Sequence, residues 1–167
     1  MAWLRKSRVD YTQLAFAIVE SAKRNRSSCT ANMHRIAHDF RMTPDAGWEA
    51  RVPVACLMGA WGVVLALHKD KALDLMPFLR SEADRMLGGI GDEFVNETMN
   101  MYQSFAQEFK YWSVDDFEKH TLLAMVAYVF GAMNMPGFAP TMATFASNMF
   151  APVLGDVHEY VVTRRIG

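Results

Sequence analysis

Cysteine is scarce in this sequence, since the 167 residues contain only Cys29 and Cys56. Two cysteines are too few for a disulfide framework, and their spacing does not match a zinc site. Cys56 lies in an apolar run, where a buried and inert thiol is the usual outcome. The basic N-terminal residues are not followed by the apolar core of a secretory signal. We therefore expect a reducing compartment and a cytoplasmic protein.

Motifs for common cofactors and nucleophiles are also missing. The sequence contains no Cys-x-x-Cys, no His-Glu-x-x-His, no Gly-Lys-Ser/Thr phosphate loop and no Gly-x-Ser-x-Gly. No glutamate is followed three residues later by histidine, as a di-iron bundle requires. The usual supports for zinc, P-loop and hydrolase functions are therefore lacking. We expect no cofactor, and these absences favour a non-enzymatic function.

A large excess of charge of either sign is absent, because 17 Lys and Arg balance 18 Asp and Glu. The chain therefore has no global field that would attract nucleic acid. Two small basic clusters lie at opposite ends of a predicted helix over 10–26, about 24 Å apart by helical rise. They do not form a continuous basic stripe, and we expect no nucleic-acid partner. The clusters are Arg5, Lys6 and Arg8, and Lys23, Arg24 and Arg26.

Alternating strand patterns and internal repeats are missing as well, whereas helical spacing of apolar residues recurs along the chain. We predict an all-α fold, a single-domain helical bundle of about six to eight helices over residues 1–167, with 1–9 a candidate for disorder. Asp10 is a predicted N-cap, Gly88 and Gly89 end a helix, and Ser113 with Asp116 resembles a capping box. The first predicted helices cover 10–26, 29–42, 52–68, 77–87 and 92–112.

The segment from Val52 to His68 has no fixed charge and is apolar on all sides. Such a pattern predicts a central buried helix. Its length, about 17 residues, is at the lower limit for crossing a bilayer. Pro53, two glycines and nearby charges favour a core helix instead, and no membrane association is expected.

No charged residue occurs between Lys119 and Asp156. Pro136, Gly137 and Pro140 divide this stretch into segments shorter than the roughly 20 residues that a membrane helix needs. We therefore expect a central apolar helical hairpin near residues 121–152, with its second helix ending near Pro152. Charge-free helix faces must be covered by protein, either by this chain or by a second copy.

Methionine and phenylalanine are concentrated in this neutral stretch, and flexible thioethers suit surfaces that adapt to variable apolar partners. The sequence favours a non-enzymatic adaptor or regulatory module that binds a protein partner or its own second copy, and a homo-oligomer is expected. The alternative is a bundle that binds a small apolar ligand or cofactor in a pocket formed by the same stretch. The candidate binding residues are Met125, Met133, Met135, Phe138, Met142, Phe145, Met149 and Phe150.

Histidines supply the remaining candidates. His34 and His38 have the i,i+4 spacing of a metal-binding pair, but the helical wheel places them on a solvent-facing flank without a buried third ligand. His68 is a candidate axial haem ligand, and His68 or His120 would point into a ligand pocket. Asp116 and His120 are also four residues apart and are candidates for acid/base chemistry, although a surface ion pair is the usual role of such a pair.

Overall fold

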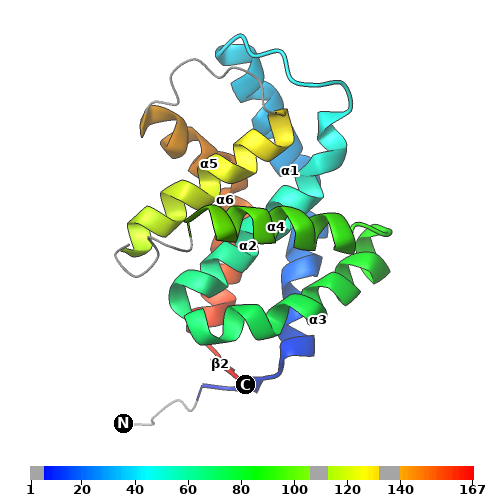
Figure 1. Cartoon of the computed structure of the whole chain (residues 1–167), viewed down its shortest axis with the longest axis vertical. Helices are drawn as coiled ribbons and strands as arrows, with labels where there is room; N and C mark the ends of the chain where they lie inside the picture. Colours follow the sequence, from blue (N-terminus) through cyan, green and yellow to red (C-terminus); the bar gives the residue numbers. More distant parts are fainter. Residues whose placement is uncertain (1–5, 106–112, 132–139) are drawn as a thin grey trace.

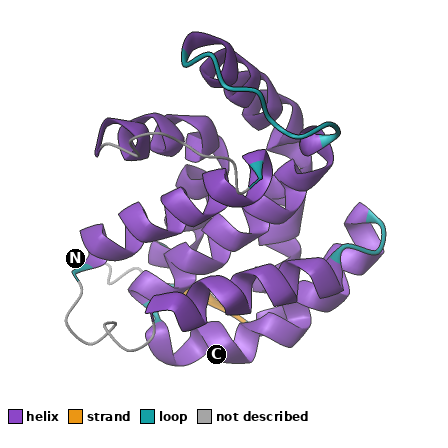
Figure 2. Ribbon diagram, turned by 45° about the horizontal axis from the view of Figure 1, so that its top comes forward, coloured by secondary structure: helices purple, strands orange, loops and turns teal. Residues whose placement is uncertain are grey.

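The computed structural model describes residues 6–105, 113–131 and 140–167. These parts of the chain form six α-helices, one short 3-10 helix and a pair of two-residue strands (Figure 1, Figure 2), which confirms the predicted all-α bundle. In chain order the elements are β1 (Arg8–Val9), α1 (Tyr11–Asp39), η1 (Trp48–Arg51), α2 (Val52–Leu67), α3 (Lys69–Leu87), α4 (Gly91–Phe105), α5 (Val114–Phe130), α6 (Pro140–Val162) and β2 (Arg165–Ile166).

Helix α2 forms the centre of the bundle (Figure 1) and packs against each of the other five helices. Almost every residue from Val52 to Leu65 is buried, as its charge-free sequence predicts. The indole nitrogen of Trp61 donates a hydrogen bond of 2.7 Å to the backbone oxygen of Ala72, which satisfies the polar atom of a fully buried ring. Each large apolar side chain buried here contributes about 1.5–3 kcal/mol to folding.

The neutral stretch forms most of α5 and α6, which pack against each other and against α2. Leu122, Val126 and Val129 are buried on α5, and Val153 and Val157 are buried on α6. Residues 132–139, which connect the two helices, lie outside the described residues. Among the described residues, much of the uncharged surface of α5 and α6 is thus covered by this chain itself, and α2 is the most completely buried helix.

Helix α1 is longer than predicted, because the expected break between 26 and 29 does not occur. Asp10 is the N-cap, and its side chain forms a capping box with Gln13. No glycine or proline interrupts the helix, and the apolar stripe continues in phase through Cys29 and Met33, which are both buried. The Thr30 hydroxyl donates to the Arg26 carbonyl, 2.8 Å away, inside the helix instead of capping a new one.

Two prolines that were expected to mark helix ends lie inside helices. Helix α3 was predicted to start at Pro77 but begins at Lys69, and α6 was expected to end near Pro152 but continues to Val162. An interior proline removes one backbone hydrogen bond and costs about 3 kcal/mol in a helix. Burial of residues on both sides of each proline offsets this cost. The buried residues are Ala72, Leu75, Met76, Leu79 and Ala83 in α3, and Met149, Phe150, Val153, Val157 and Val161 in α6.

The remaining helix ends largely follow the local sequence signals. Gly88 ends α3 with φ of 78°, a left-handed conformation that glycine adopts at little cost. Ser113 forms the expected capping box with Asp116 at the start of α5. Helix α4 runs over 91–105, where a helix over 92–112 was predicted, and residues 106–112 lie outside the described residues.

A short parallel strand pair, which the sequence pattern does not predict, joins segments near the two ends of the described chain. Arg8 and Val9 of β1 pair with Arg165 and Ile166 of β2, and the two apolar residues are buried. The expectation of disorder over 1–9 therefore does not describe residues 8–9. Pairs of two residues carry no alternating pattern that a sequence analysis could detect.

A polar cluster joins α1 to α6 beside the bundle core. One carboxylate oxygen of Asp156 accepts hydrogen bonds from Arg24 at 2.7 Å and from Ser21 at 2.8 Å. Asn25 donates to the same oxygen from 3.1 Å. Partial burial raises the pKa of Asp156, but these three donors favour the charged form more strongly, and the pKa stays below its ordinary value.

Candidate functional site

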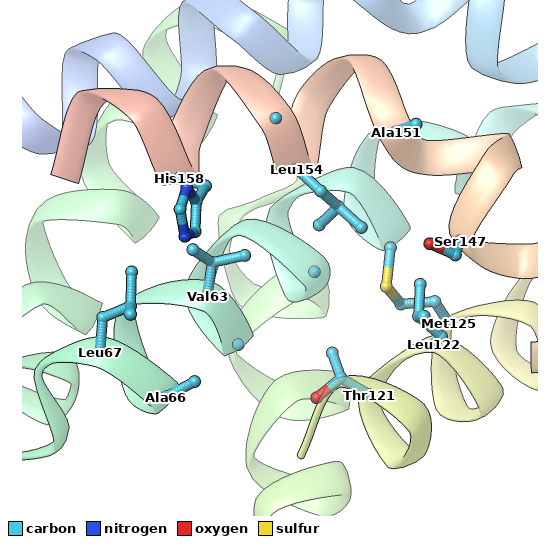
Figure 3. Close-up of a pocket in the computed structure, with 13 residues that line it drawn as sticks. Val63, Ala66, Leu67, Thr121, Leu122, Met125, Ser147, Ala151, Leu154 and His158 are labelled. Atoms are coloured by element: carbon cyan, nitrogen blue, oxygen red, sulfur yellow. The ribbon is translucent and has the colours of Figure 1, made fainter. Parts of the chain in front are cut away.

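A cleft of about 390 Å³ opens between α2, α5 and α6 (Figure 3). Its lining is mostly apolar, and much of it comes from the same neutral stretch that the sequence analysis singled out. Cavities of 300–1,000 Å³ with apolar walls are typical of small-molecule sites. The described lining residues are Gly59, Gly62, Val63, Ala66 and Leu67 from α2, Thr121, Leu122 and Met125 from α5, and Ser147, Ala151, Leu154, Gly155 and His158 from α6.

Two glycines of α2 allow α5 to pack closely at the base of this cleft. A Cβ atom on Gly62 would lie 2.7 Å from the Thr121 Cγ2 atom, and one on Gly59 would lie 2.5 Å from the Met125 Cε atom. Such distances are shorter than van der Waals contact. The absence of both side chains therefore sets the α2–α5 separation.

Small residues of α6 form the opposite side of the cleft. Ser147, Ala151 and Gly155 follow one another at four-residue steps, so they share one face of the helix. A Cβ atom on Gly155 would meet no other atom within 4 Å. Gly155 is therefore not required by close packing, and its missing side chain leaves the space beside α6 open.

Polar atoms are few in the cleft. The Thr121 hydroxyl, the Ser147 hydroxyl and the His158 imidazole are the polar side-chain groups, and Figure 3 shows His158 directed from α6 toward Val63. Among the described lining residues there is no Lys, Arg, Asp or Glu. Because an unpaired charge in an apolar environment is costly, the cleft suits an uncharged ligand with at most a few hydrogen-bonding atoms.

The predicted methionine and phenylalanine set is only partly described. Met125 lines the cleft, whereas Met149 and Phe150 are buried in the core with 1% and 0% exposure. Met133, Met135 and Phe138 lie outside the described residues, and so do the side chains of Met142 and Phe145. Each of the three described members is therefore covered by this chain.

Neither His68 nor His120 is among the described residues that line the cleft. His68 lies at the junction of α2 and α3, where its backbone N–H donates to the Val64 carbonyl at 2.7 Å. His120 lies on α5, next to the lining residue Thr121, and is exposed. The histidine of this cleft is His158 instead.

The candidate metal pair is exposed on α1, and the two imidazoles have different partners. The Nε2 atom of His34 lies 3.4 Å from a carboxylate oxygen of Glu49, and the ring packs edge-on against Trp48. The Nδ1 atom of His38 lies 3.4 Å from a carboxylate oxygen of Asp39. Within 6–105, 113–131 and 140–167, no group of three or more His, Cys, Asp or Glu side chains is arranged to hold a metal ion.

Asp116, the other acid/base candidate, is engaged at the start of α5. Its carboxylate accepts hydrogen bonds from the Ser113 backbone N–H at 2.8 Å and from the Ser113 hydroxyl at 2.9 Å. These bonds favour the ionised form and lower the pKa of Asp116. The carboxylate therefore serves as part of a helix cap.

His158 is not among the predicted site residues, because a hairpin whose second helix ends near Pro152 does not reach it. A signal for it exists in the sequence: Ser147, Ala151 and Gly155 form a stripe of small residues, and His158 continues the same helical face one turn later. The stripe becomes visible only when the helix is allowed to continue through the proline. Sequence alone does not show which helix faces it.

No protein-family model, curated protein or solved structure matches this chain.

Proposed function

We propose that this protein is a non-enzymatic binding protein that holds a small, uncharged apolar ligand in the cleft between α2, α5 and α6. The observation that supports this function best is the cleft itself, with about 390 Å³ of space and no charged residue among its described lining side chains. The function that the sequence favours, docking of a partner on a methionine and phenylalanine face, has less support than this alternative. Met125, Met149 and Phe150 are all buried within this chain.

Gly155 gives the second argument for a ligand. A glycine inside a helix costs about 0.5–1 kcal/mol relative to alanine, so it needs a compensating reason. Gly59 and Gly62 have one, because α5 approaches them closely. Gly155 is exposed on the α6 side of the cleft, with open space where its side chain would be, and room for a ligand would supply a reason.

The side chains around the cleft suggest how such a ligand would be held. Leu154 is half-buried beside the cleft, and its side chain can adapt to the shape of a ligand. Met125 lies behind it with 0% exposure, where its flexible thioether can shift when a ligand enters. His158 and Ser147 lie on α6 about 16 Å apart by helical rise, so polar groups occur near both ends of that helix segment. A ligand with an apolar body and one polar end would match this arrangement.

The test compares two substitutions at Gly155. In Gly155→Leu the new side chain points back over Ala151 and occupies the cleft, whereas Gly155→Ala adds a single methyl group. Both changes raise helix propensity, and we expect both variants to be at least as stable as the wild type. Binding of 1-aminoanthracene, an uncharged fluorescent apolar probe, is measured by titration.

We expect one saturable site in the wild type and in Gly155→Ala. In Gly155→Leu we expect the probe affinity to fall by about tenfold or more, corresponding to about 1.4 kcal/mol. Because thermal stability is measured on the same samples, a loss of binding through misfolding would be recognised. Equal binding by Gly155→Leu and the wild type, or no saturable binding by the wild type, would contradict the proposal.

A further inference from the structure

His158 is the titratable side chain among the described residues that line the cleft. It is exposed on α6, and Figure 3 shows its ring on the side of the cleft where Val63 and Leu67 of α2 lie. His34 and His38 each have a carboxylate neighbour. The His158 imidazole has no ion pair, hydrogen bond or ring contact with another residue of the described chain. Its polar atoms are therefore available to a ligand.

A ligand that fills the cleft covers this imidazole and displaces the water around it. The ring nitrogens then lose hydrogen bonds to water, and a ligand that offers no replacement leaves them unpaired at a cost in affinity. A site that contains such a group discriminates strongly between a ligand that bonds to it and an analogue that does not. His158 therefore favours ligands with a hydrogen-bonding group at its end of the cleft.

The surroundings of His158 also limit the charge of that group. The described lining contributes no Lys, Arg, Asp or Glu to balance a carboxylate or an ammonium head. A neutral imidazole has one nitrogen that donates a hydrogen bond and one that accepts. A hydroxyl group both donates and accepts, so it can pair with either nitrogen in either tautomer.

We propose that His158 determines the ligand specificity of the cleft by binding the hydroxyl head of a neutral amphiphile, such as a linear primary alcohol. Leu154 and Ala151 lie one and two turns before His158 on the same face of α6. The apolar tail of the ligand lies along these residues. The inference rests on the proposed function, because it assigns a ligand class to the same cleft.

The experiment measures how well two ligands of equal length displace 1-aminoanthracene from the wild type and from His158→Leu. The ligands are 1-nonanol and 1-chlorononane, in which chlorine replaces the hydroxyl and forms no comparable hydrogen bond. Each ligand is compared with itself between the two proteins, so their different solubilities in water cancel. We expect His158→Leu to weaken binding of the alcohol by about tenfold and to leave binding of the chloroalkane unchanged or tighter.

His38→Leu is the matched control, because His38 is an exposed histidine on α1 outside the cleft. We expect this variant to bind both ligands like the wild type. Thermal unfolding of all three proteins shows whether each variant is folded. Both substitutions replace an exposed side chain, so we expect little change in stability.

The charge of the head is tested with nonanoate, which is ionised in neutral buffer. We expect it to displace the probe from the wild type about tenfold less effectively than 1-nonanol, because the cleft offers its carboxylate no counter-charge. A nonanoate affinity equal to or above that of the alcohol would overturn the assignment of a neutral head.

Two further results would overturn the role of His158. One is an alcohol affinity that is the same in His158→Leu and the wild type. The other is an equal loss for alcohol and chloroalkane, which would mean that the ring only packs against the tail. In both cases saturable probe binding by the wild type would leave the proposed function standing. If the wild type does not bind the probe, the proposed function fails and the inference fails with it.

Discussion

At the scale of single residues, Thr98 is an exception to the rule that buried polar atoms are paired. It lies on α4 with 0% exposure, and its hydroxyl has no hydrogen-bond partner among the described residues. An unpaired buried hydroxyl lowers stability because it loses its bond to water without replacement. Thr98 is therefore a residue at which a substitution should stabilise the protein.

We predict that Thr98→Val raises the free energy of unfolding by about 1 kcal/mol, because valine has nearly the same shape without the polar atom. Urea unfolding monitored by circular dichroism measures the change. Thr163→Val makes the same substitution at an exposed threonine whose hydroxyl is paired, since it donates a 2.7 Å hydrogen bond to the Glu159 carbonyl. A stability gain at both threonines, or at neither, would show that the unpaired hydroxyl is not the cause.

Some helix ends could be predicted from single residues and their near neighbours in the sequence. Asp10 and Ser113 were predicted as caps, and both form capping boxes in which side chain and backbone bond within four residues. Gly88 likewise ends α3 through its own conformation. These signals are local, and the residues that carry them are neighbours in the sequence.

At the scale of helices, the glycines of α2 make a direct prediction about the α2–α5 contact. Gly62 faces Thr121, a buried and β-branched residue that has little rotational freedom. Gly59 faces the end of Met125, which has three rotatable bonds and can move aside. The same substitution at the two glycines should therefore have different effects.

We predict that Gly62→Ala lowers the free energy of unfolding by about 1–3 kcal/mol, the usual cost of overpacking a core. Gly59→Ala should change it by less than about 1 kcal/mol, because gained helix propensity offsets a small shift of Met125 and Leu154. Urea denaturation of both variants beside the wild type measures the difference. Equal losses at both positions would contradict the distinction between a rigid and a flexible neighbour.

The start of α3 and the end of α6 could not be predicted from local sequence signals. Pro77 and Pro152 were interpreted as helix ends, yet α3 and α6 run through them. Whether a helix continues past a proline depends on the apolar area that its two halves bury against other helices, and this area belongs to the tertiary structure. The stripe of small residues on α6 was obscured for the same reason, and with it His158 and much of the cleft.

At the scale of the whole molecule, the chain contains one helical segment long and apolar enough to cross a membrane, Trp48–Leu67, counting the described residues alone. In the structure 72% of its most apolar 18 residues are buried, and α2 packs against each of the other five described helices. A central core helix and a membrane helix have the same composition, and they differ in what covers them. Here the cover is protein, supplied by five amphipathic or apolar helices.

This arrangement predicts that the protein stays dispersed without detergent and that backbone amides of α2 exchange with solvent more slowly than those of any other described helix. The slowest amides require global unfolding, and an element enclosed on all sides opens only with the whole molecule. Hydrogen exchange measured by mass spectrometry, with α4 as the peripheral reference, tests the second part. Light scattering in detergent-free buffer tests the first. Aggregation that only detergent reverses, or α2 amides that exchange as fast as those of α4, would show that α2 is not covered by its own chain.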